Sequence, residues 1–288
     1  DTIVDFHNQL VQNPETSALV INANLRLVDK DVLLHAHEWF HDKLVVSLGD
    51  YSYPKLMDMY CGTPQSLEFT NILLRKMGMG CTVSVKESKP SDWLKSAGAA
   101  SSNLLNLFEG GDIAESVHSY EDNDIAIRSN GRRKVIRELE FIQYGANGFK
   151  RAVKPAAQSS GTIHLLSVMA LLYQAIFTDR TVVVDGLDTG INSASIKDLC
   201  KLFCDSKSKG QLFYTSNSLM PMNQQEMIRV DETWLMEKRD GSSAMIALDK
   251  FSKVKIKALL SLERNYLDGR FGALPGTPVA EDLEGILM

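Results

Sequence analysis

Four consecutive β-branched residues, Thr181 to Val184, constrain the fold of this chain more than any other feature of its sequence. Such a run predicts a strand that is buried on both faces, as in a parallel sheet covered by helices. A long apolar segment, 162–178, precedes it and is typical of a core helix. A second predicted helix, 193–204, and a second predicted strand, 211–215, follow after short loops. This alternation predicts an α/β fold with a mostly parallel sheet.

Two lobes are predicted from the distribution of the helix and strand patterns. Residues 1–123 are expected to form a helical and mixed lobe, and residues 124–288 the core lobe that contains the buried strand. Residues 89–123 are rich in Ser, Ala, Gly and Asp, which predicts a mobile linker or surface excursion. The elements predicted for the first lobe are helices at 2–10, 29–40 and 64–77 and strands at 44–47 and 81–85.

The beginning of the core lobe predicts an antiparallel β element between residues 124 and 153. Strand-like segments there are separated by Asn-Gly dipeptides at 130–131 and 147–148, which favour the positive φ angles of tight turns. A final hairpin is predicted at 233–248 around the Asp-Gly dipeptide at 240–241. The core lobe is therefore expected to combine a parallel sheet with antiparallel strands.

The composition is that of a folded protein, with 44% hydrophobic and 23% charged residues. A net charge of −5 gives no global attraction to nucleic acid, although basic residues at 132–134 and 150–151 leave a local contact with phosphates open. A solvated strand face is the favoured explanation of these charges. No signal peptide and no apolar run of ~20 residues occurs, so we expect a cytoplasmic protein with no membrane contact. The four cysteines lack metal or disulfide spacing and are predicted to be reduced core thiols: Cys61, Cys81, Cys200 and Cys204.

Two short motifs are candidates for ligand binding. Asp185 follows the buried strand, at the sheet edge where α/β folds place ligands, and a carboxylate there can hold Mg²⁺ beside nucleotide phosphates. Its alternative role is to cap the following loop or helix. The turn Ser159-Ser160-Gly161-Thr162 opens the predicted core helix, so that backbone N–H groups, the helix dipole and hydroxyl groups favour an anion. An ordinary Ser/Thr helix cap is the alternative for this turn.

Two other groups of residues are weaker candidates. His35, His37 and His41 suggest a metal site, but only the last two share a helix face. Ser167 and His164 lie on the core helix without the strand-turn-helix context of a hydrolase nucleophile. Neither group is expected to carry the function.

The order of the motifs resembles that of the ABC-type AAA ATPases of anti-phage and abortive-infection systems, relatives of the OLD and SMC/Rad50 class and members of the P-loop NTPases. In that family a signature turn and helix precede a buried strand that ends in aspartate, as at Asp185, and a Leu-Asp loop and a further strand follow, as at 187–188 and 212–215. The ending Tyr-Leu-Asp-Gly-Arg-Phe-Gly-Ala-Leu-Pro at 266–275 and the segment 38–44 are also similar to the family. The resemblance covers most of the chain.

The resemblance implies a head-to-head dimer or higher oligomer, with ATP and Mg²⁺ held between the phosphate loop of one subunit and the signature turn of the other. Within the turn 159–162, Ser160 and Gly161 would contact the γ-phosphate across the interface. Asp185 would position Mg²⁺, and Asp188 would lie in the loop that joins the two sites.

Three departures from the family pattern predict impaired hydrolysis. No G-x-x-x-x-G-K-[ST] phosphate loop occurs in this chain, which fits a chain that begins downstream of that loop in a longer protein. Gly186 stands where the family has a glutamate base, and Asn217 where it has a histidine that senses the γ-phosphate. Loss of a general base costs about 10² to 10⁴ in rate. We therefore expect binding that outlasts hydrolysis, and a rise in turnover on Gly186→Glu in an intact version.

The function implied by the resemblance is a sensor or scaffold subunit of a defence system, whose nucleotide state controls a nuclease or toxin partner. The alternative is a nucleotide-independent scaffold built on a former ATPase fold. A DNA-bridging ATPase of the SMC type would need long heptad runs, and the sequence has none. Magnesium-dependent ATP binding favours the first function, and oligomerisation that ignores nucleotide favours the second.

Overall fold

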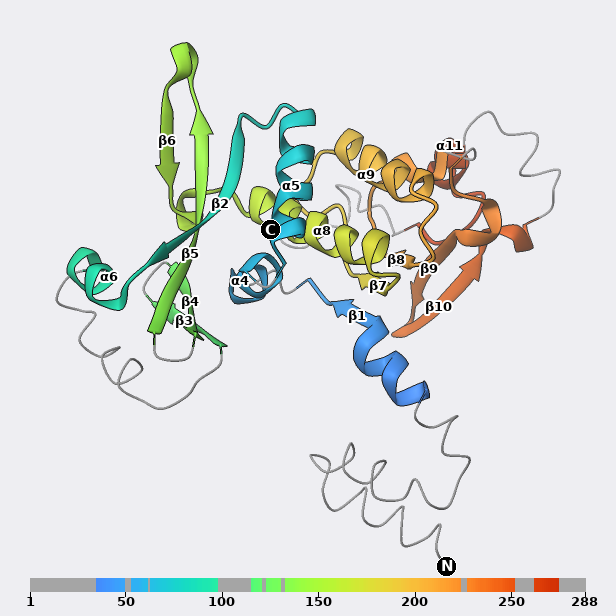
Figure 1. Cartoon of the computed structure of the whole chain (residues 1–288). Coiled ribbons are helices and arrows are strands. Elements are labelled where there is room, and N and C mark those ends of the chain that lie inside the picture. Colours follow the sequence, from blue (N-terminus) through green and yellow to red (C-terminus); the bar gives the residue numbers. More distant parts are fainter. Residues whose placement is uncertain are drawn as a thin grey trace, which may run out of the picture.

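A computed structural model describes residues 35–49, 53–61, 63–97, 115–120, 123–130, 133–223, 227–251 and 262–274 (Figure 1). The α-helices within these residues are α4 (Tyr53–Cys61), α5 (Pro64–Lys76), α6 (Pro90–Ala97), α8 (Ser160–Phe177), α9 (Ser193–Asp205) and α11 (Leu262–Leu267). The strands are β1 (Leu44–Ser47), β2 (Cys81–Ser88), β3 (Glu115–Tyr120), β4 (Asn123–Asn130), β5 (Arg133–Tyr144), β6 (Lys150–Val153), β7 (Thr181–Val184), β8 (Gln211–Tyr214), β9 (Trp234–Arg239) and β10 (Ser242–Ala247). The predicted helix 2–10 and the beginning of the predicted helix 29–40 lie outside the described residues.

The strand predicted from the β-branched run is the centre of a three-stranded parallel sheet. β7 pairs with β1 on one side and with β8 on the other, in the order β1-β7-β8. Val182 and Val184 are buried, while Val183 is half-buried between Val46 and Phe213, which are both exposed. The prediction of an α/β fold with a parallel sheet is confirmed, although one face of this sheet is more open than the sequence suggested.

Helix α8 is the main core helix of the molecule. Its residues 164–172 and Ala175 are buried, and Figure 1 shows it crossing between the parallel sheet and α5. By length and composition it is the one helix in the described part of the chain that is apolar enough to cross a membrane. Burial all round is equally typical of a core helix, and here α8 packs against α4, α5, α9, β7 and β8.

A five-stranded antiparallel sheet forms the other end of the molecule, in green in Figure 1. The long strand β5 pairs with β2 along one edge, and with β4 and then β6 along the other. β3 pairs with the outer edge of β4. The antiparallel element predicted for residues 124–153 is confirmed, but it is larger than predicted because β2 and β3 belong to it.

The stretch 89–123 differs from the linker that the sequence predicted. Residues 90–97 form helix α6, in which Trp93 is buried, and residues 115–120 form β3. Helix formation follows from Pro90 at the first helical position, a place where proline is favoured. The low hydrophobicity of the segment obscured these elements, although β3 pairs with the next strand, β4, and α6 packs against the more distant β5.

One buried cluster joins the parallel sheet to the antiparallel sheet. It takes side chains from α4, α5, β2, β5, α8, β7 and α9. Tyr60 of α4 is completely buried in it and donates a hydrogen bond of 2.8 Å to the carbonyl oxygen of Leu166 in α8. The division into lobes at residue 123 stays a prediction, and the antiparallel sheet takes strands from both sides of that position.

A second, smaller cluster holds the C-terminal hairpin, which confirms the hairpin predicted at 233–248. Its buried members are Leu235, Leu248, Leu262 and Phe271. Glu237 accepts a hydrogen bond of 3.1 Å from the backbone N–H of Ala273. The segment whose sequence resembles the family's ending is therefore packed on β9.

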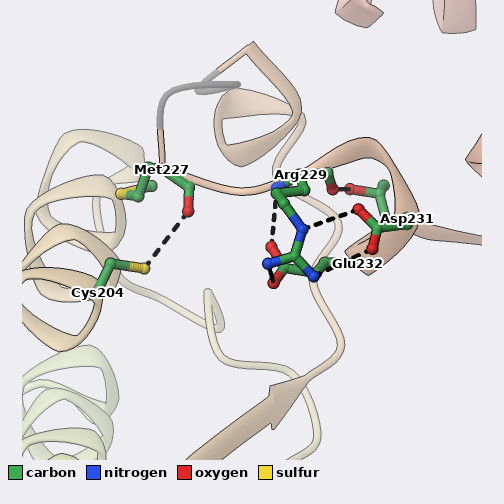
Figure 2. A network of polar contacts seen from close by, with 6 residues as sticks. Cys204, Met227, Arg229, Asp231 and Glu232 are labelled. Carbon is green, nitrogen blue, oxygen red and sulfur yellow. Dashed lines mark hydrogen bonds and ion pairs between the residues drawn. The ribbon is translucent and has the colours of Figure 1, made fainter. Parts of the chain in front are cut away.

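The chain enters this hairpin through a short turn that is held by Arg229 (Figure 2). The guanidinium group of Arg229 forms two hydrogen bonds of 3.0 Å with Asp231 and an ion pair of 2.9 Å with Glu232. Nearby, the thiol of Cys204 donates a hydrogen bond to the carbonyl oxygen of Met227. Cys204 is exposed, so the prediction of four core thiols is wrong for this residue; the other three cysteines are buried. Cys204 follows Cys200 by one turn on the same face of α9, but it lies at the end of the helix, where its thiol reaches Met227.

Candidate functional site

The loop 185–190 follows β7 at the carboxyl end of the parallel sheet. Its first residue, Asp185, is exposed, and its backbone N–H donates a hydrogen bond of 2.8 Å to Ser47 of β1. The backbone N–H of Leu187 donates one of 2.9 Å to the carbonyl oxygen of Thr215, just after β8. Both neighbouring strands thus hold the loop, which places Asp185 where α/β sheets bind ligands.

The hydroxyl group of Thr215 orients the carboxylate of Asp185. It donates a hydrogen bond of 2.5 Å to Oδ1 of Asp185 and accepts one of 2.8 Å from the backbone N–H of Gly186. The threonine therefore fixes both the carboxylate and the peptide that follows it. The sequence placed Thr215 at the end of a strand, but gave no signal for this contact because it joins two adjacent strands.

Gly186 has a backbone conformation that favours glycine. Its φ angle is +67°, and a Cβ atom at this position would lie 2.8 Å from Oγ1 of Thr189. A non-glycine residue in the left-handed region costs roughly 1–2 kcal/mol. The backbone at residue 186, where the sequence resemblance implies a glutamate base, thus favours a residue without a side chain.

The turn 159–162 begins helix α8 as predicted. Ser159 is the N-cap, and its Oγ accepts a hydrogen bond of 3.1 Å from the backbone N–H of Thr162. The hydroxyl groups of the two residues are also hydrogen-bonded, at 2.9 Å. Ser159 therefore plays the ordinary capping role that the sequence left open, and Ser160 is the exposed hydroxyl residue in the first turn.

The turn 159–162 and the loop 185–190 are in direct contact. A Cβ atom on Gly161 would lie 2.3 Å from the carbonyl oxygen of Gly190, so the two backbones meet where no side chain fits. One helical turn further, Nε2 of His164 lies 3.1 Å from the carbonyl oxygen of Leu187. The turn and the loop, which are separated in the sequence by helix α8 and strand β7, thus form one region of the structure.

His164 is buried within this contact. Burial lowers the pKa of His164 below its ordinary value of 6.5, while the carbonyl groups of Leu187 and Gly186 and the carboxylate of Asp188 act in the opposite direction. A neutral imidazole whose Nε2 carries the proton donates to the Leu187 carbonyl. Sequence reasoning considered His164 only as part of a hydrolase triad and missed this role.

Asp188 contacts Asn217, but the contact is made to the backbone of Asn217 and not to its side chain. The carboxylate of Asp188 accepts a hydrogen bond of 3.2 Å from the backbone N–H of Asn217. Asp188 thereby ties the loop to the segment after β8. The identity of the side chain at 217 does not enter this contact.

The residues present fit a magnesium-nucleotide by their chemistry. Magnesium takes few protein ligands beside phosphates, and one oriented carboxylate such as that of Asp185 is a suitable donor. The first turn of α8 offers backbone N–H groups and the hydroxyl group of Ser160 to an anion, while the hydroxyl groups of Ser159 and Thr162 bond to each other. Within the described residues, no three His, Cys, Asp or Glu side chains gather as the ligands of a protein-only metal site would.

Residues of the weaker candidate groups have partners within the protein. Arg137, which follows the basic residues 132–134 on β5, forms an ion pair of 2.8 Å with Glu87 and donates a hydrogen bond to the carbonyl oxygen of Cys61. The rings of His37 and His41 are stacked, and His41 is hydrogen-bonded to Asp42. These contacts are sufficient to explain the residues structurally.

No protein-family model and no curated protein matches the sequence. Among solved structures the chain is similar to heads of SMC ATPases. One, studied for ATP-driven dimerization and DNA-stimulated activation, is 15% identical with a TM-score of 0.37, over 70% of this chain and 96% of that chain. A second, a head bound to the C-winged helix domain of ScpA, is 14% identical with a TM-score of 0.40, over 71% and 56%. A third, a head with coiled coil and joint from Pyrococcus yayanosii, is 13% identical with a TM-score of 0.37, over 89% and 38%.

This chain spans 56% and 38% of the second and third of these structures. Likeness at such identities and TM-scores does not extend to chemistry. The function must therefore be argued from the residues of this chain.

Proposed function

We propose that this protein contributes the signature turn 159–162 and the metal-binding carboxylate of Asp185 to the two ATP sites of an ABC-type dimer, in which hydrolysis is impaired. The protein acts as a nucleotide-dependent sensor or scaffold rather than as a fast ATPase. ATP is sandwiched between two subunits, so nucleotide occupancy controls self-association.

The observation that carries this proposal is the contact between Gly161 and Gly190. It joins the anion-binding end of α8 to the loop that begins at Asp185. A short, hydrogen-bonded loop thus connects the two kinds of group that a magnesium-nucleotide needs, a phosphate-binding helix end and an oriented carboxylate. An isolated cap and an isolated loop aspartate would need no such connection.

Impaired hydrolysis is supported by the conformation of Gly186. A glutamate at this position would have to adopt φ +67° and avoid Thr189, so the loop would be strained by the very residue that activates water in the family. Binding needs no base, because Asp185 and the first turn of α8 act on the ground state of the nucleotide. We therefore expect ATP binding to be retained although hydrolysis is impaired.

The biological role that we propose is control of an effector, a nuclease or toxin subunit, in an anti-phage defence system. This role follows from the sequence resemblance of the segment 158–275. A slow nucleotide cycle suits a sensor, because the assembled state persists until nucleotide dissociates. Nucleic acid is not required as a ligand in this proposal.

The test is magnesium-dependent ATP binding by the full-length gene product. Anisotropy of a fluorescent ATP analogue is measured with Mg²⁺ and with EDTA, alongside phosphate release. We expect saturable binding only with Mg²⁺ and no steady release of phosphate. Asp185→Asn should weaken binding by at least about tenfold, because a charge-assisted contact to the cation is lost. Asp205→Asn, which removes an exposed carboxylate of α9 paired with Lys201, should leave binding unchanged.

Light scattering with and without Mg²⁺-ATP separates this function from the alternative, a nucleotide-independent scaffold. A change in oligomer size on adding nucleotide supports the sensor. Equal oligomer size in both conditions, together with no analogue binding, would establish the scaffold instead. Two observations also fit this alternative. The backbone conformation of Gly186 disfavours a glutamate base, and the hydroxyl groups of Ser159 and Thr162 are bonded to each other.

A further inference from the structure

The contact between His164 and Leu187 differs from the other contacts that hold the loop 185–190. Hydrogen bonds to Ser47, Thr215 and Asn217 attach the loop to the sheet side of the molecule. His164 attaches it to helix α8, together with the close packing of Gly161 on Gly190. The loop is therefore held by both the sheet and the helix.

A histidine is unexpected at this place if packing alone decides. Its neighbours on the helix, Leu165, Leu166 and Val168, are buried and apolar, and a leucine would fill the same space. Burying an imidazole without a hydrogen bond is unfavourable. The hydrogen bond to Leu187, whose own side chain is buried, satisfies a donor and an acceptor in the interior at once.

We propose that His164 is a positioning residue that makes the loop 185–190 move with the first turn of α8. Binding of an anion at Ser160 and Gly161 is then coupled to binding of a cation at Asp185, through His164 and Leu187. This inference rests on the proposed function and adds the means by which the two ATP sites of the dimer communicate through one subunit, whose turn serves one site and whose Asp185 serves the other. The coupling is reciprocal, since each ligand changes the affinity of the other by the same factor.

Amide hydrogen exchange of the intact protein without nucleotide tests the attachment. His164→Leu keeps the volume but removes the donor, whereas His164→Gln keeps an N–H donor of similar reach. We expect exchange of the amides of Leu187, Thr189 and Ile191 to be about tenfold faster in His164→Leu and near wild type in His164→Gln. Ser167→Ala is the matched control, because Ser167 is a buried polar residue on the same helix that bonds only locally, to Ile163.

A second measurement tests the coupling. The affinity for a magnesium-bound nonhydrolysable ATP analogue is measured for Ser160→Ala, Asp185→Asn and the double variant, and the departure of the double variant from the product of the two single effects gives the coupling factor. We expect a factor of at least about five in the wild-type background, preserved with His164→Gln and approaching one with His164→Leu. Loss of packing would affect both variants alike, so rescue by glutamine assigns the effect to the hydrogen bond.

The outcomes of the two measurements distinguish failure of the proposed function from failure of the role of His164. Absence of analogue binding in every variant, including the wild type, overturns the proposed function, while the exchange rates still decide whether His164 holds the loop. Unchanged exchange in His164→Leu overturns the positioning role even where nucleotide binds. Faster exchange with an unchanged coupling factor also overturns the inference, since His164 would then serve the stability of the loop alone.

Discussion

The backbone of Gly161 in the first turn of α8 touches the carbonyl oxygen of Gly190, at a distance that leaves no room for a side chain on residue 161. Gly190 itself has a φ angle of +68°, which favours glycine for a conformational reason. The two positions thus favour glycine for different reasons. Gly161 permits the close approach of the two backbones, and Gly190 permits the turn of the loop.

Gly161→Ala is expected to destabilise the protein by about 1–3 kcal/mol, because the added methyl group would collide with the backbone of Gly190. The sign of the change in the free energy of unfolding is diagnostic, since a glycine-to-alanine substitution within a helix normally stabilises the protein by up to about 1 kcal/mol. Denaturant unfolding measures the change. Ser160→Ala is the matched control, as Ser160 is exposed in the same turn; equal effects of the two substitutions would contradict the contact.

Gly186→Glu is expected to lower stability by roughly 1–2 kcal/mol and to give little turnover by itself. Sequence alone predicts that turnover rises when the base is restored, but the strain at this position leads us to expect little gain from the substitution. Gly186→Ala carries the same backbone strain without a carboxylate. Comparing phosphate release by the two variants isolates the effect of the base, and fast release by Gly186→Glu at undiminished stability would show that the loop adapts freely.

The stability of the protein should fall on acidification through His164. Burial lowers the pKa of this residue in the folded state below 6.5, so the unfolded chain binds a proton first as the pH decreases. The stabilisation of the neutral form is complete above pH 6.5 and is lost progressively below it. Urea unfolding at pH 7.5 and 5.5 checks this: wild type should lose more stability than His164→Gln, and parallel losses would show that His164 is not the group responsible.

Alkylation should distinguish two cysteines that lie one turn apart on α9. Burial raises the pKa of Cys200 to about 11, so at pH 8 about one thiol in a thousand is ionised, and the sulfur is also shielded. Cys204 is exposed. Iodoacetamide treatment of the native protein followed by peptide mass analysis should label Cys204 first. Earlier labelling of Cys200 would mean that α9 opens locally.

Local sequence patterns determined the elements of the core lobe. The β-branched run 181–184, the apolar segment after Ser159 and the Asn-Gly dipeptides each encode their element through side-chain shape or backbone preference, which act over a few residues. α6 and β3 were missed because the segment is poor in apolar residues, and both elements also pack on distant parts of the chain, α6 on β5 and β3 on α4.

Tertiary structure alone decided how the candidate residues are used. The sequence by itself named Ser159, Ser160, Gly161, Thr162, Asp185 and Asp188, but it gave no information on which groups bond to each other. Thr215 reaches Asp185, and His164 reaches Leu187, only because parallel strands end at one edge and α8 packs against that edge. Contacts of this kind depend on the relative placement of whole elements. The open face at Val46 and Phe213 and the glycine-shaped conformation of residue 186 were decided in the same way.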